Sequence, residues 1–191
     1  MIGDEVILKN LYVILINSET YFTKVIRLFT KNKYNHVVFA LDNNCDKMYT
    51  FARWITWFPL FAGFEIENIN RGVLKKKPKA SCQIYEIEIS EEEHFLLQSR
   101  LTPFLTKPRR KFWYNFAALL LIQLKLPYYS DTSFVCSTFV AYIVGDIINM
   151  NKHFIHVTPN DYLKLDMPMI YEGELKKYVN NNNELKIASL V

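Results

Sequence analysis

The feature that most constrains the fold is a continuous apolar run near the start of the chain, Leu-Tyr-Val-Ile-Leu-Ile at residues 11–16. Six consecutive β-prone residues without polar alternation are typical of a strand that is covered on both faces. Capping residues then precede apolar positions at helical spacing, so we expect a short helix over 22–29. Strands over 36–41 and 47–53 follow. The chain is therefore predicted to combine a buried sheet with helices.

The later elements follow from the same periodicities. A period-two pattern at 82–89 predicts a strand with one wet face, and Ser90 followed by three glutamates predicts a helix start. Pro103 is expected to end that helix after about Leu101. The full set comprises strands over 64–70 and 82–89, helices over 91–101, 113–124 and 134–148, a short helix opening at 158–161, and a polar tail that we expect to fray from about residue 180.

Composition excludes several classes of protein. The chain has 191 residues, is 50% hydrophobic and 15% aromatic, and contains only 5 Gly and 7 Pro, which argues against a disordered or collagen-like protein. The net charge of +4 is spread along the sequence, so nothing in it requires nucleic acid as a partner. We therefore expect one domain over residues 1–191.

Several signals favour a cytoplasmic location. The first five residues include two acids where an export signal would carry lysines, and the most apolar stretches, 116–122 and 134–148, are shorter than the roughly 20 residues of a membrane-spanning helix. Cys45, Cys82 and Cys136 form an odd set without CxxC spacing, which argues against disulfides or a zinc knuckle. We expect reduced thiols, with neither a metal nor a cofactor.

The candidate nucleophile is Cys136, in the segment Phe134–Tyr142. Asp131, Thr132 and Ser133 are competent caps for this helix, which places the cysteine in its first turn. There the free backbone N–H groups and the helix dipole favour a thiolate and lower the thiol pKa. The same amides can stabilise the oxyanion of an acyl intermediate. The alternative is a small buried side chain on a core helix, a common place for cysteine.

Among the four histidines, His36 is the candidate base. It stands at the start of an apolar strand, and a rigid strand end can hold an imidazole whose second nitrogen is fixed by a third group. His94 lies among acids on an amphipathic helix, and His153 and His156 lack further ligands at metal-binding spacing. The alternative for His36 is a hydrogen-bonded side chain at the rim of the core.

The segments Tyr34–Leu41 and Phe134–Tyr142, in this order, resemble the permuted papain-like cysteine hydrolases. These are YiiX-like relatives of the NlpC peptidoglycan endopeptidases and of lecithin retinol acyltransferase. Their histidine strand precedes the cysteine helix, the reverse of papain's order. The resemblance extends over roughly residues 10 to 175 through short matches at 48–53, 62–64, 114–115 and 158–161.

The resemblance implies an α+β fold, circularly permuted relative to papain. An antiparallel sheet or small barrel would pack against helices, with the nucleophile at a helix N-terminus. It also implies that Cys136 and His36 are catalytic. Tyr114 is the best match to a tyrosine that such families place upstream of the nucleophile to donate to the oxyanion; a packing role is the alternative.

The third catalytic residue is less clear. In the superfamily a polar residue on the strand after the histidine strand orients the imidazole, and it is often a histidine or a glutamate. The matching stretch here offers Tyr49 and Thr50, of which Thr50 is favoured, with Glu65 and Glu67 on the next strand as alternatives. A neutral partner stabilises imidazolium less than a buried acid does.

These residues predict a thiol-dependent amidase, peptidase or acyltransferase that forms a thioester on Cys136. The substrate would be a small peptide, a muropeptide or an acyl amide, and the oligomeric state is not specified. One alternative is a non-catalytic binding module on the same fold, suggested by the lack of an acidic residue next to Thr50. Another is an interfacial lipid-modifying enzyme, suggested by the apolar stretch 116–126 and the basic run 107–111.

Overall fold

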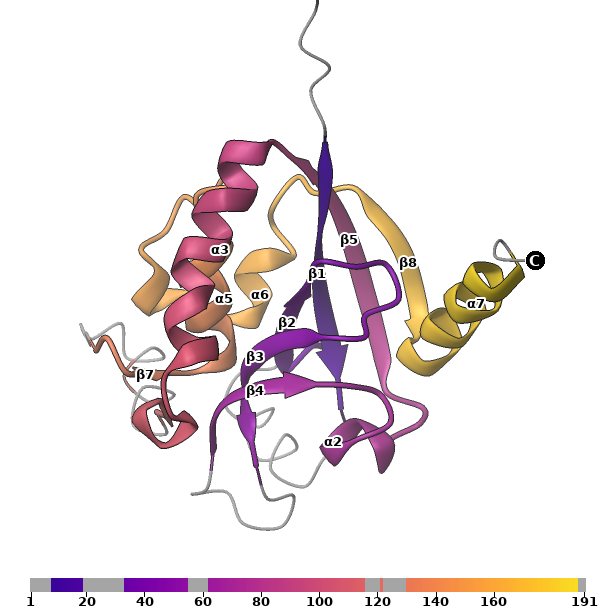
Figure 1. Cartoon of the computed structure of the whole chain (residues 1–191), viewed down its shortest axis with the longest axis horizontal. Helices are drawn as coiled ribbons and strands as arrows, with labels where there is room; N and C mark the ends of the chain where they lie inside the picture. Colours follow the sequence, from indigo (N-terminus) through magenta and orange to yellow (C-terminus); the bar gives the residue numbers. More distant parts are fainter. Residues whose placement is uncertain (1–7, 19–32, 55–61, 116–120, 122–129, 189–191) are drawn as a thin grey trace, which may run out of the picture.

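The apolar run near the start of the chain forms β1 (Lys9–Asn17), an interior strand of the sheet that is covered on both faces, as predicted (Figure 1). Because successive side chains of a strand point to opposite faces, its residues divide between two apolar clusters. Leu11, Val13 and Leu15 belong to one cluster, and Tyr12, Ile14 and Ile16 to the other. A computed structural model of the chain describes residues 8–18, 33–54, 62–115, 121 and 130–188. The helix expected over 22–29 and the apolar stretch 116–126, apart from residue 121, lie outside these residues.

Within the described residues, eight strands form one mixed sheet in the order β7-β6-β4-β3-β2-β1-β5-β8. Neighbouring strands are antiparallel except β6 and β7, which are parallel. The class is therefore α+β, as predicted, but the sheet is open and not purely antiparallel. The remaining strands are β2 (His36–Ala40), β3 (Met48–Arg53), β4 (Ala62–Glu67), β5 (Ser81–Ile89), β6 (Trp113–Tyr114), β7 (Ser133–Phe134) and β8 (Met169–Glu174).

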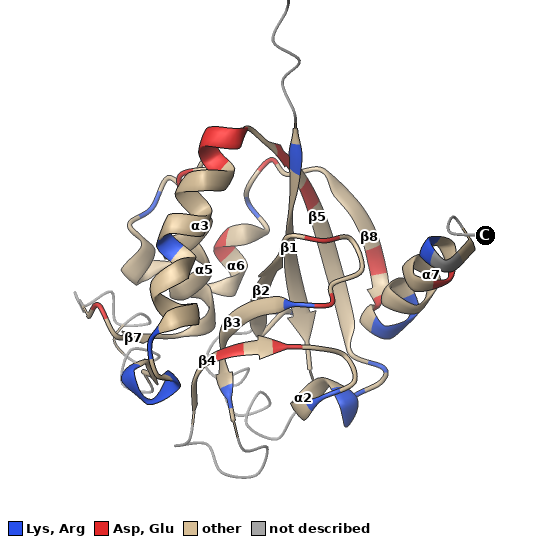
Figure 2. Ribbon diagram, viewed as in Figure 1, with Lys and Arg blue, Asp and Glu red and all other residues tan. Residues whose placement is uncertain are grey.

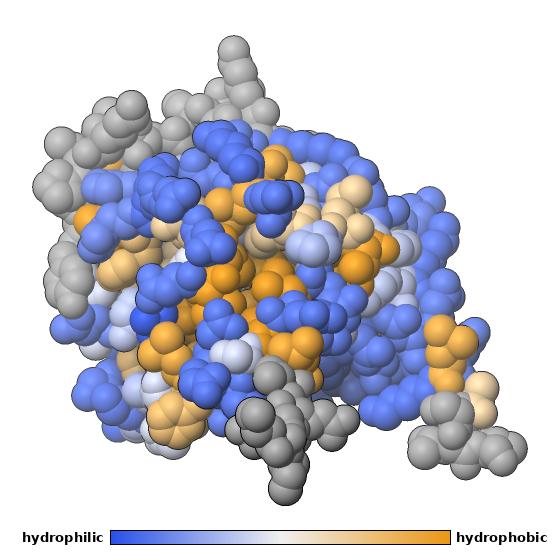
Figure 3. All heavy atoms as spheres, turned by 90° about the horizontal axis from the view of Figure 1, so that it is seen from above, coloured by the Kyte–Doolittle hydropathy of each residue, from blue (hydrophilic) through white to orange (hydrophobic). Residues whose placement is uncertain are grey.

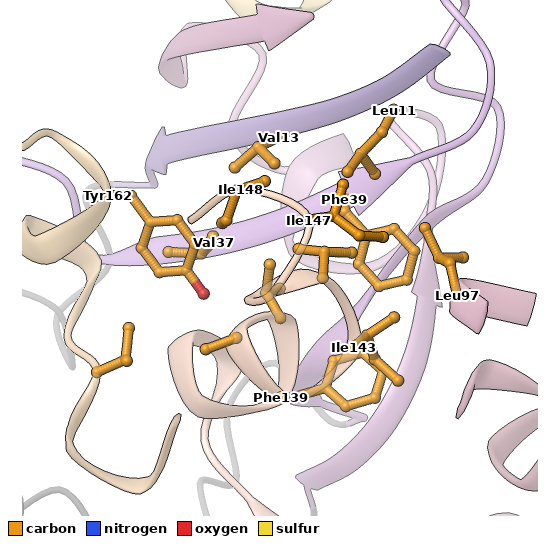
Figure 4. Packing of buried hydrophobic residues seen from close by; sticks show 14 of the residues in the cluster. Leu11, Val13, Val37, Phe39, Leu97, Phe139, Ile143, Ile147, Ile148 and Tyr162 are labelled. Atoms are coloured by element: carbon orange, nitrogen blue, oxygen red, sulfur yellow. The ribbon is translucent and has the colours of Figure 1, made fainter. Parts of the chain in front are cut away.

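Helices cover both faces of this sheet. Those on the first cluster are α3 (Glu91–Thr106), α5 (Cys136–Val144) and α6 (Pro159–Tyr162), and those on the second are α2 (Gly72–Lys75) and α7 (Leu175–Ala188). Two short 3-10 helices, η1 (Arg109–Lys111) and η2 (Phe154–His156), connect other elements. Figure 4 shows how Val37 and Phe39 of β2 pack against Phe139 and Ile143 of α5. The central strands and the nucleophile helix thus share one core.

The helix after Ser90 continues through Pro103 to Thr106 instead of ending near Leu101. Proline removes the hydrogen bond to the carbonyl four residues earlier, which normally bends or ends a helix. Here the extra turn buries Phe104, which is only 4% exposed and whose ring packs 5.0 Å from that of Phe139. Burial of this ring offsets the missing hydrogen bond.

Trp113 and Tyr114 form a strand, although the sequence predicted a helix from 113. Trp113 pairs with Gly63 on one side and with Ser133 on the other, so β6 is held between two strands. Long-range pairing of this kind is invisible to local periodicity. Residue 121 is helical, and the rest of the predicted helix lies outside the described residues.

The polar residues from 180 onward, expected to fray, belong to α7. Leu175 and Val179 anchor this helix in the second cluster, and the Asn182 side chain donates a 2.8 Å hydrogen bond to the carbonyl of Asn43. The asparagine-rich run therefore occupies the outer face of a docked helix.

The two ends of β1 differ in surface character. Apolar side chains reach the surface where β1, α3 and β8 begin; they are Leu8, Phe95 and Met169. Figure 3 views this end of the molecule and shows apolar patches among hydrophilic residues. At its other end β1 pairs through Ile16 with His36, the candidate base. The candidate site therefore lies at the opposite end of the strand.

Candidate active site

Cys136 is the first residue of α5. The expected caps Asp131, Thr132 and Ser133 do not start this helix, because the chain pairs as β7 through Phe134 and the cap residue is Val135. Val135 has no side-chain acceptor, and its backbone N–H instead donates to Thr138 Oγ1 at 3.1 Å. The helix thus begins two residues later than predicted, which puts the sulfur at its very start, where free backbone N–H groups are available.

Four groups hydrogen-bond to the Cys136 sulfur. They are the His36 imidazole, the Tyr114 hydroxyl and the backbone N–H groups of Val37 and Ser137. Burial by itself raises the pKa of this thiol, but the hydrogen bonds and the positive charge of His36 outweigh it and lower the pKa below its usual value. The residue is 5% exposed. The surroundings therefore favour a thiolate.

The other two cysteines have the opposite electrostatics. Cys45 and Cys82 are buried free thiols of the second apolar cluster. Burial raises the pKa of Cys82 to about 12 and raises that of Cys45 still further. Both remain protonated at neutral pH, so Cys136 differs from them in its environment and not merely in its position.

His36, the first residue of β2, bridges Cys136 and Glu67. Its Nε2 lies 2.8 Å from Glu67 Oε2, which leaves Nδ1 to face the sulfur. Burial alone would lower the pKa of His36, but the carboxylate of Glu67 and the hydrogen bond to Cys136 outweigh it and raise the pKa to about 10. The side chains of His36 and Glu67 are 15% and 11% exposed, so solvent screens this pair weakly. The imidazole is held as imidazolium at neutral pH.

The structure places Glu67, and not Thr50, on the imidazole. Cross-strand pairs Phe39–Tyr49 and Met48–Glu67 put His36, Thr50 and Glu67 on the same face of the sheet. The Thr50 hydroxyl donates to the carbonyl of Val37 at 2.8 Å. Figure 1 shows β3 and β4 crossing in front of β1, a strong curl of the sheet, and the carboxylate reaches the histidine from two strands away.

The other two candidates for the third position have different partners. The Tyr49 ring packs against that of Phe39, with centroids 5.3 Å apart. Glu65 forms an ion pair with Arg109 of η1. Glu67 is thus the one of the four candidates that the described contacts join to His36.

Tyr114 lies beside the nucleophile because β6 pairs in parallel with β7, Tyr114 opposite Phe134. Burial and the negative charge of Cys136 raise the pKa of its hydroxyl well above the usual value, so the hydroxyl keeps its proton and acts as a donor. This position fits the oxyanion-stabilising role implied by the resemblance.

The Gly-Phe segment at 62–64 explains how β6 reaches this position. Gly63 lies opposite Trp113, and a Cβ at residue 63 would sit 2.1 Å from the backbone oxygen of Phe112. A backbone oxygen cannot swing aside as a flexible side chain can. Glycine is therefore required here for the close approach of β4 and β6.

The Thr-Pro-Asn-Asp segment fixes the start of α5. Asp161 caps α6 by accepting a 2.8 Å hydrogen bond from the Thr158 N–H, and this helix carries the fully buried Tyr162. The Tyr162 hydroxyl donates to the carbonyl of Ser137 at 2.7 Å, and Ser137 Oγ donates to the carbonyl of Val157 at 2.7 Å. Sequence reasoning identified the capping pattern but not this tie to the residue after the nucleophile.

The remaining histidines lie elsewhere. His94 on α3 contacts Lys9 Nζ through Nδ1 at 3.3 Å, and His153 stacks on Phe154. Nδ1 of His156 is buried without a hydrogen-bond partner among the described residues. In this part of the chain no group of three or more His, Cys, Asp or Glu could hold a metal ion, and no helix is long and apolar enough to cross a bilayer.

Comparisons with known proteins return no match among family models, curated proteins or solved structures. The functional argument therefore depends on the arrangement of Cys136, His36, Glu67 and Tyr114.

Proposed function

We propose that the protein is a thiol-dependent hydrolase or acyltransferase that acts on an amide or ester through a thioester on Cys136. The observation that carries this proposal is the contact between the Cys136 thiol, whose pKa is lowered, and the His36 imidazole, whose pKa is raised. A core cysteine gains nothing from such a pair, whereas a nucleophile requires it.

The reaction follows from the groups around the sulfur. The thiolate attacks the carbonyl carbon, and the Tyr114 hydroxyl and backbone N–H groups at the start of α5 stabilise the oxyanion. The C–N or C–O bond then breaks as the His36 imidazolium protonates the leaving group. Neutral His36 next takes a proton from water or an acceptor amine, which attacks the thioester and releases the thiolate. Glu67 stabilises the imidazolium at both protonated stages.

We further propose that the fold is a circularly permuted papain-like fold. In its support, the histidine strand β2 precedes the cysteine helix α5, the helix starts at the nucleophile, and an acidic residue lies on the far side of the imidazole. A reducing cytoplasm remains our proposal for its location, because all three cysteines are free thiols.

The two alternatives are less well supported. A non-catalytic module was suggested by the missing acid next to Thr50, and Glu67 supplies a carboxylate at the imidazole. The apolar stretch 116–126 that suggested an interfacial lipid enzyme lies almost wholly outside the described residues. Neither alternative gains a specific observation.

Selective alkylation tests the proposal. At about pH 6, below the pKa of ordinary thiols, iodoacetamide should label Cys136 much faster than Cys45 or Cys82, as read by peptide mass mapping of the whole protein. The excess should disappear in His36→Ala, while His94→Ala serves as the matched control and retains it. Slow and equal labelling of the three cysteines in the wild-type protein would contradict the proposal.

A further inference from the structure

Arg53, the last residue of β3, lies beside the site but has no role in the reaction above. It pairs with Ala62 across the sheet, next to Gly63, which faces β6. Its side chain is partly buried, and its charge interacts with the Tyr114 hydroxyl and with the Glu67 carboxylate. A guanidinium therefore lies next to two of the groups that build the site.

More cations follow on η1, which leads directly into β6. The Arg109 guanidinium lies 5.7 Å from the ring centroid of Trp54, the residue after Arg53, so the two arginines are separated by one indole. Figure 2 shows the basic residues of η1 and the acidic residues of β4 on the same side of the molecule. We call this group the basic rim; it consists of Arg53, Arg109, Arg110 and Lys111.

The basic rim leaves an excess of positive charge around the site. Of the two carboxylates on this face of β4, Glu67 is paired with His36 and Glu65 with Arg109. The Cys136 thiolate balances the His36 imidazolium that Glu67 also contacts. The remaining rim cations are not matched by these carboxylates, so a negatively charged ligand is favoured at this side of the site.

We propose that the basic rim selects acyl substrates that carry a carboxylate near the carbonyl under attack, and that Arg53 binds this carboxylate. This inference rests on the proposed function and narrows its substrate class. A guanidinium offers paired N–H donors in the geometry of a carboxylate, and partial burial strengthens that interaction relative to one in water. The exposed cations of η1 instead act at longer range and guide the anion toward the site.

Two alkylating probes of nearly equal size test the inference without knowledge of the substrate. Iodoacetate is an anion and iodoacetamide is neutral, and in both reactions the sulfur–carbon bond forms as iodide leaves. Because both attack the same thiolate, a change in the pKa of Cys136 affects the two rates equally. The rate ratio of iodoacetate to iodoacetamide, divided by the same ratio for a small free thiol, therefore reports the preference of the site for an anion.

Three variants separate the contribution of Arg53. Arg53→Gln removes the charge, Arg53→Lys keeps it, and Lys176→Gln removes one exposed charge on α7, next to the opposite edge strand of the sheet. We expect a normalised ratio above one for the wild type, Arg53→Lys and Lys176→Gln, and a fall of about threefold or more in Arg53→Gln. Circular dichroism and the unfolding midpoint establish that each variant is folded.

A second measurement extends the test to acyl transfer. Two p-nitrophenyl esters of equal chain length, one neutral and one ending in a carboxylate, share a leaving group and differ in charge. The wild-type protein should prefer the carboxylate ester in kcat/KM, and Arg53→Gln should lose this preference while it retains turnover of the neutral ester.

The outcomes distinguish the two proposals. If neither probe labels Cys136 faster than an ordinary thiol, the proposed function itself fails. If Cys136 reacts rapidly but the normalised ratio is one or less, or does not change in Arg53→Gln, the function stands and carboxylate selection by Arg53 is overturned.

Discussion

The Glu67 carboxylate lies 2.8 Å from Nε2 of His36, although the two residues belong to strands separated by β3. This contact makes the imidazole a stable cation beside the sulfur, since Glu67 contributes more than any other group to raising the pKa of His36. The charge of Glu67 thus controls how readily Cys136 ionises.

Glu67→Gln preserves the shape of this side chain and removes its charge. We expect the pKa of His36 to fall and that of Cys136 to rise, because the imidazolium is less stable. In iodoacetamide labelling across pH, the rising limb should move to higher pH, with a rate loss of about tenfold at pH 6, the effect of one pKa unit. Glu65→Gln, on the same strand face, should leave the profile unchanged; an unaltered profile in Glu67→Gln would contradict the contact.

Stability should depend on pH through the same pair. His36 has a pKa of about 10 when folded and 6.5 when unfolded, so its contribution is complete below pH 6.5 and is lost as pH rises through 10. Cys136 has a lowered pKa when folded, so its contribution grows as pH rises toward the unfolded value of 9.0. Between pH 6.5 and 9 the two changes oppose each other.

Cys136→Ser removes one half of that balance. We expect the free energy of unfolding of this variant to fall as pH rises above 6.5, while the wild-type value stays flatter up to about pH 9. Urea unfolding at a series of pH values measures both curves. Adding Glu67→Gln to Cys136→Ser should flatten the curve, and a steep slope that persists in this double variant would assign the effect to other groups.

Tyr114→Phe removes a single hydroxyl next to the sulfur. We expect slower labelling near pH 6, because one hydrogen bond to the thiolate is lost. Hydrolysis of a p-nitrophenyl ester should fall by a larger factor, about 10², as for loss of an oxyanion donor. Tyr49→Phe, whose ring packs on Phe39, is the control and should change neither rate. Equal losses in labelling and hydrolysis would argue against an oxyanion role.

Tyr162→Phe tests the tie between α6 and the nucleophile helix. Loss of the 2.7 Å hydrogen bond to the Ser137 carbonyl should destabilise the protein by about 1 kcal/mol in urea unfolding. It should also slow labelling of Cys136, because the start of α5 is held less firmly. Tyr142→Phe, on the partly exposed side of the same helix, should alter neither quantity. Loss of stability with normal labelling would make Tyr162 purely structural.

Gly63→Ala should separate β6 from β4. The added Cβ meets the backbone oxygen of Phe112, so we expect a loss of about 1–3 kcal/mol together with slower labelling of Cys136, because Tyr114 moves with β6. Gly72→Ala is the matched control: residue 72 has a φ of +58° and open space around it, so strain costs stability without disturbing the site. Normal labelling in Gly63→Ala would contradict this account.

Local patterns were enough to predict the central strands and the two main candidates. The unbroken apolar run of β1 requires cover on both faces, and the approach of His36 to Cys136 followed from a family resemblance between two short segments. The acidic partner was misassigned because alternation along β3 identifies a polar position, Thr50, but not the curl of the sheet. That curl brings in Glu67 from the next strand.

Other departures share this origin. Pro103 ends a helix only if nothing beyond it is worth burying, and the ring of Phe104 lies within 5.0 to 6.3 Å of several other aromatic rings. The aromatic pair at 113–114 fits a helix or a strand equally well by local pattern, and only pairing with Gly63 and Ser133 decides between them. Tertiary contacts thus overrode local preference at both positions.

The groups that ionise Cys136 come from β2, β4 and β6, so the full length of chain between residues 36 and 136 must be folded before they meet. While the polypeptide is still emerging from the ribosome, or after it has been denatured, its thiol is as inert as any free cysteine near neutral pH. Chemical competence is in this way conditional on correct folding, which protects the nascent chain from premature oxidation and from modifying its neighbours.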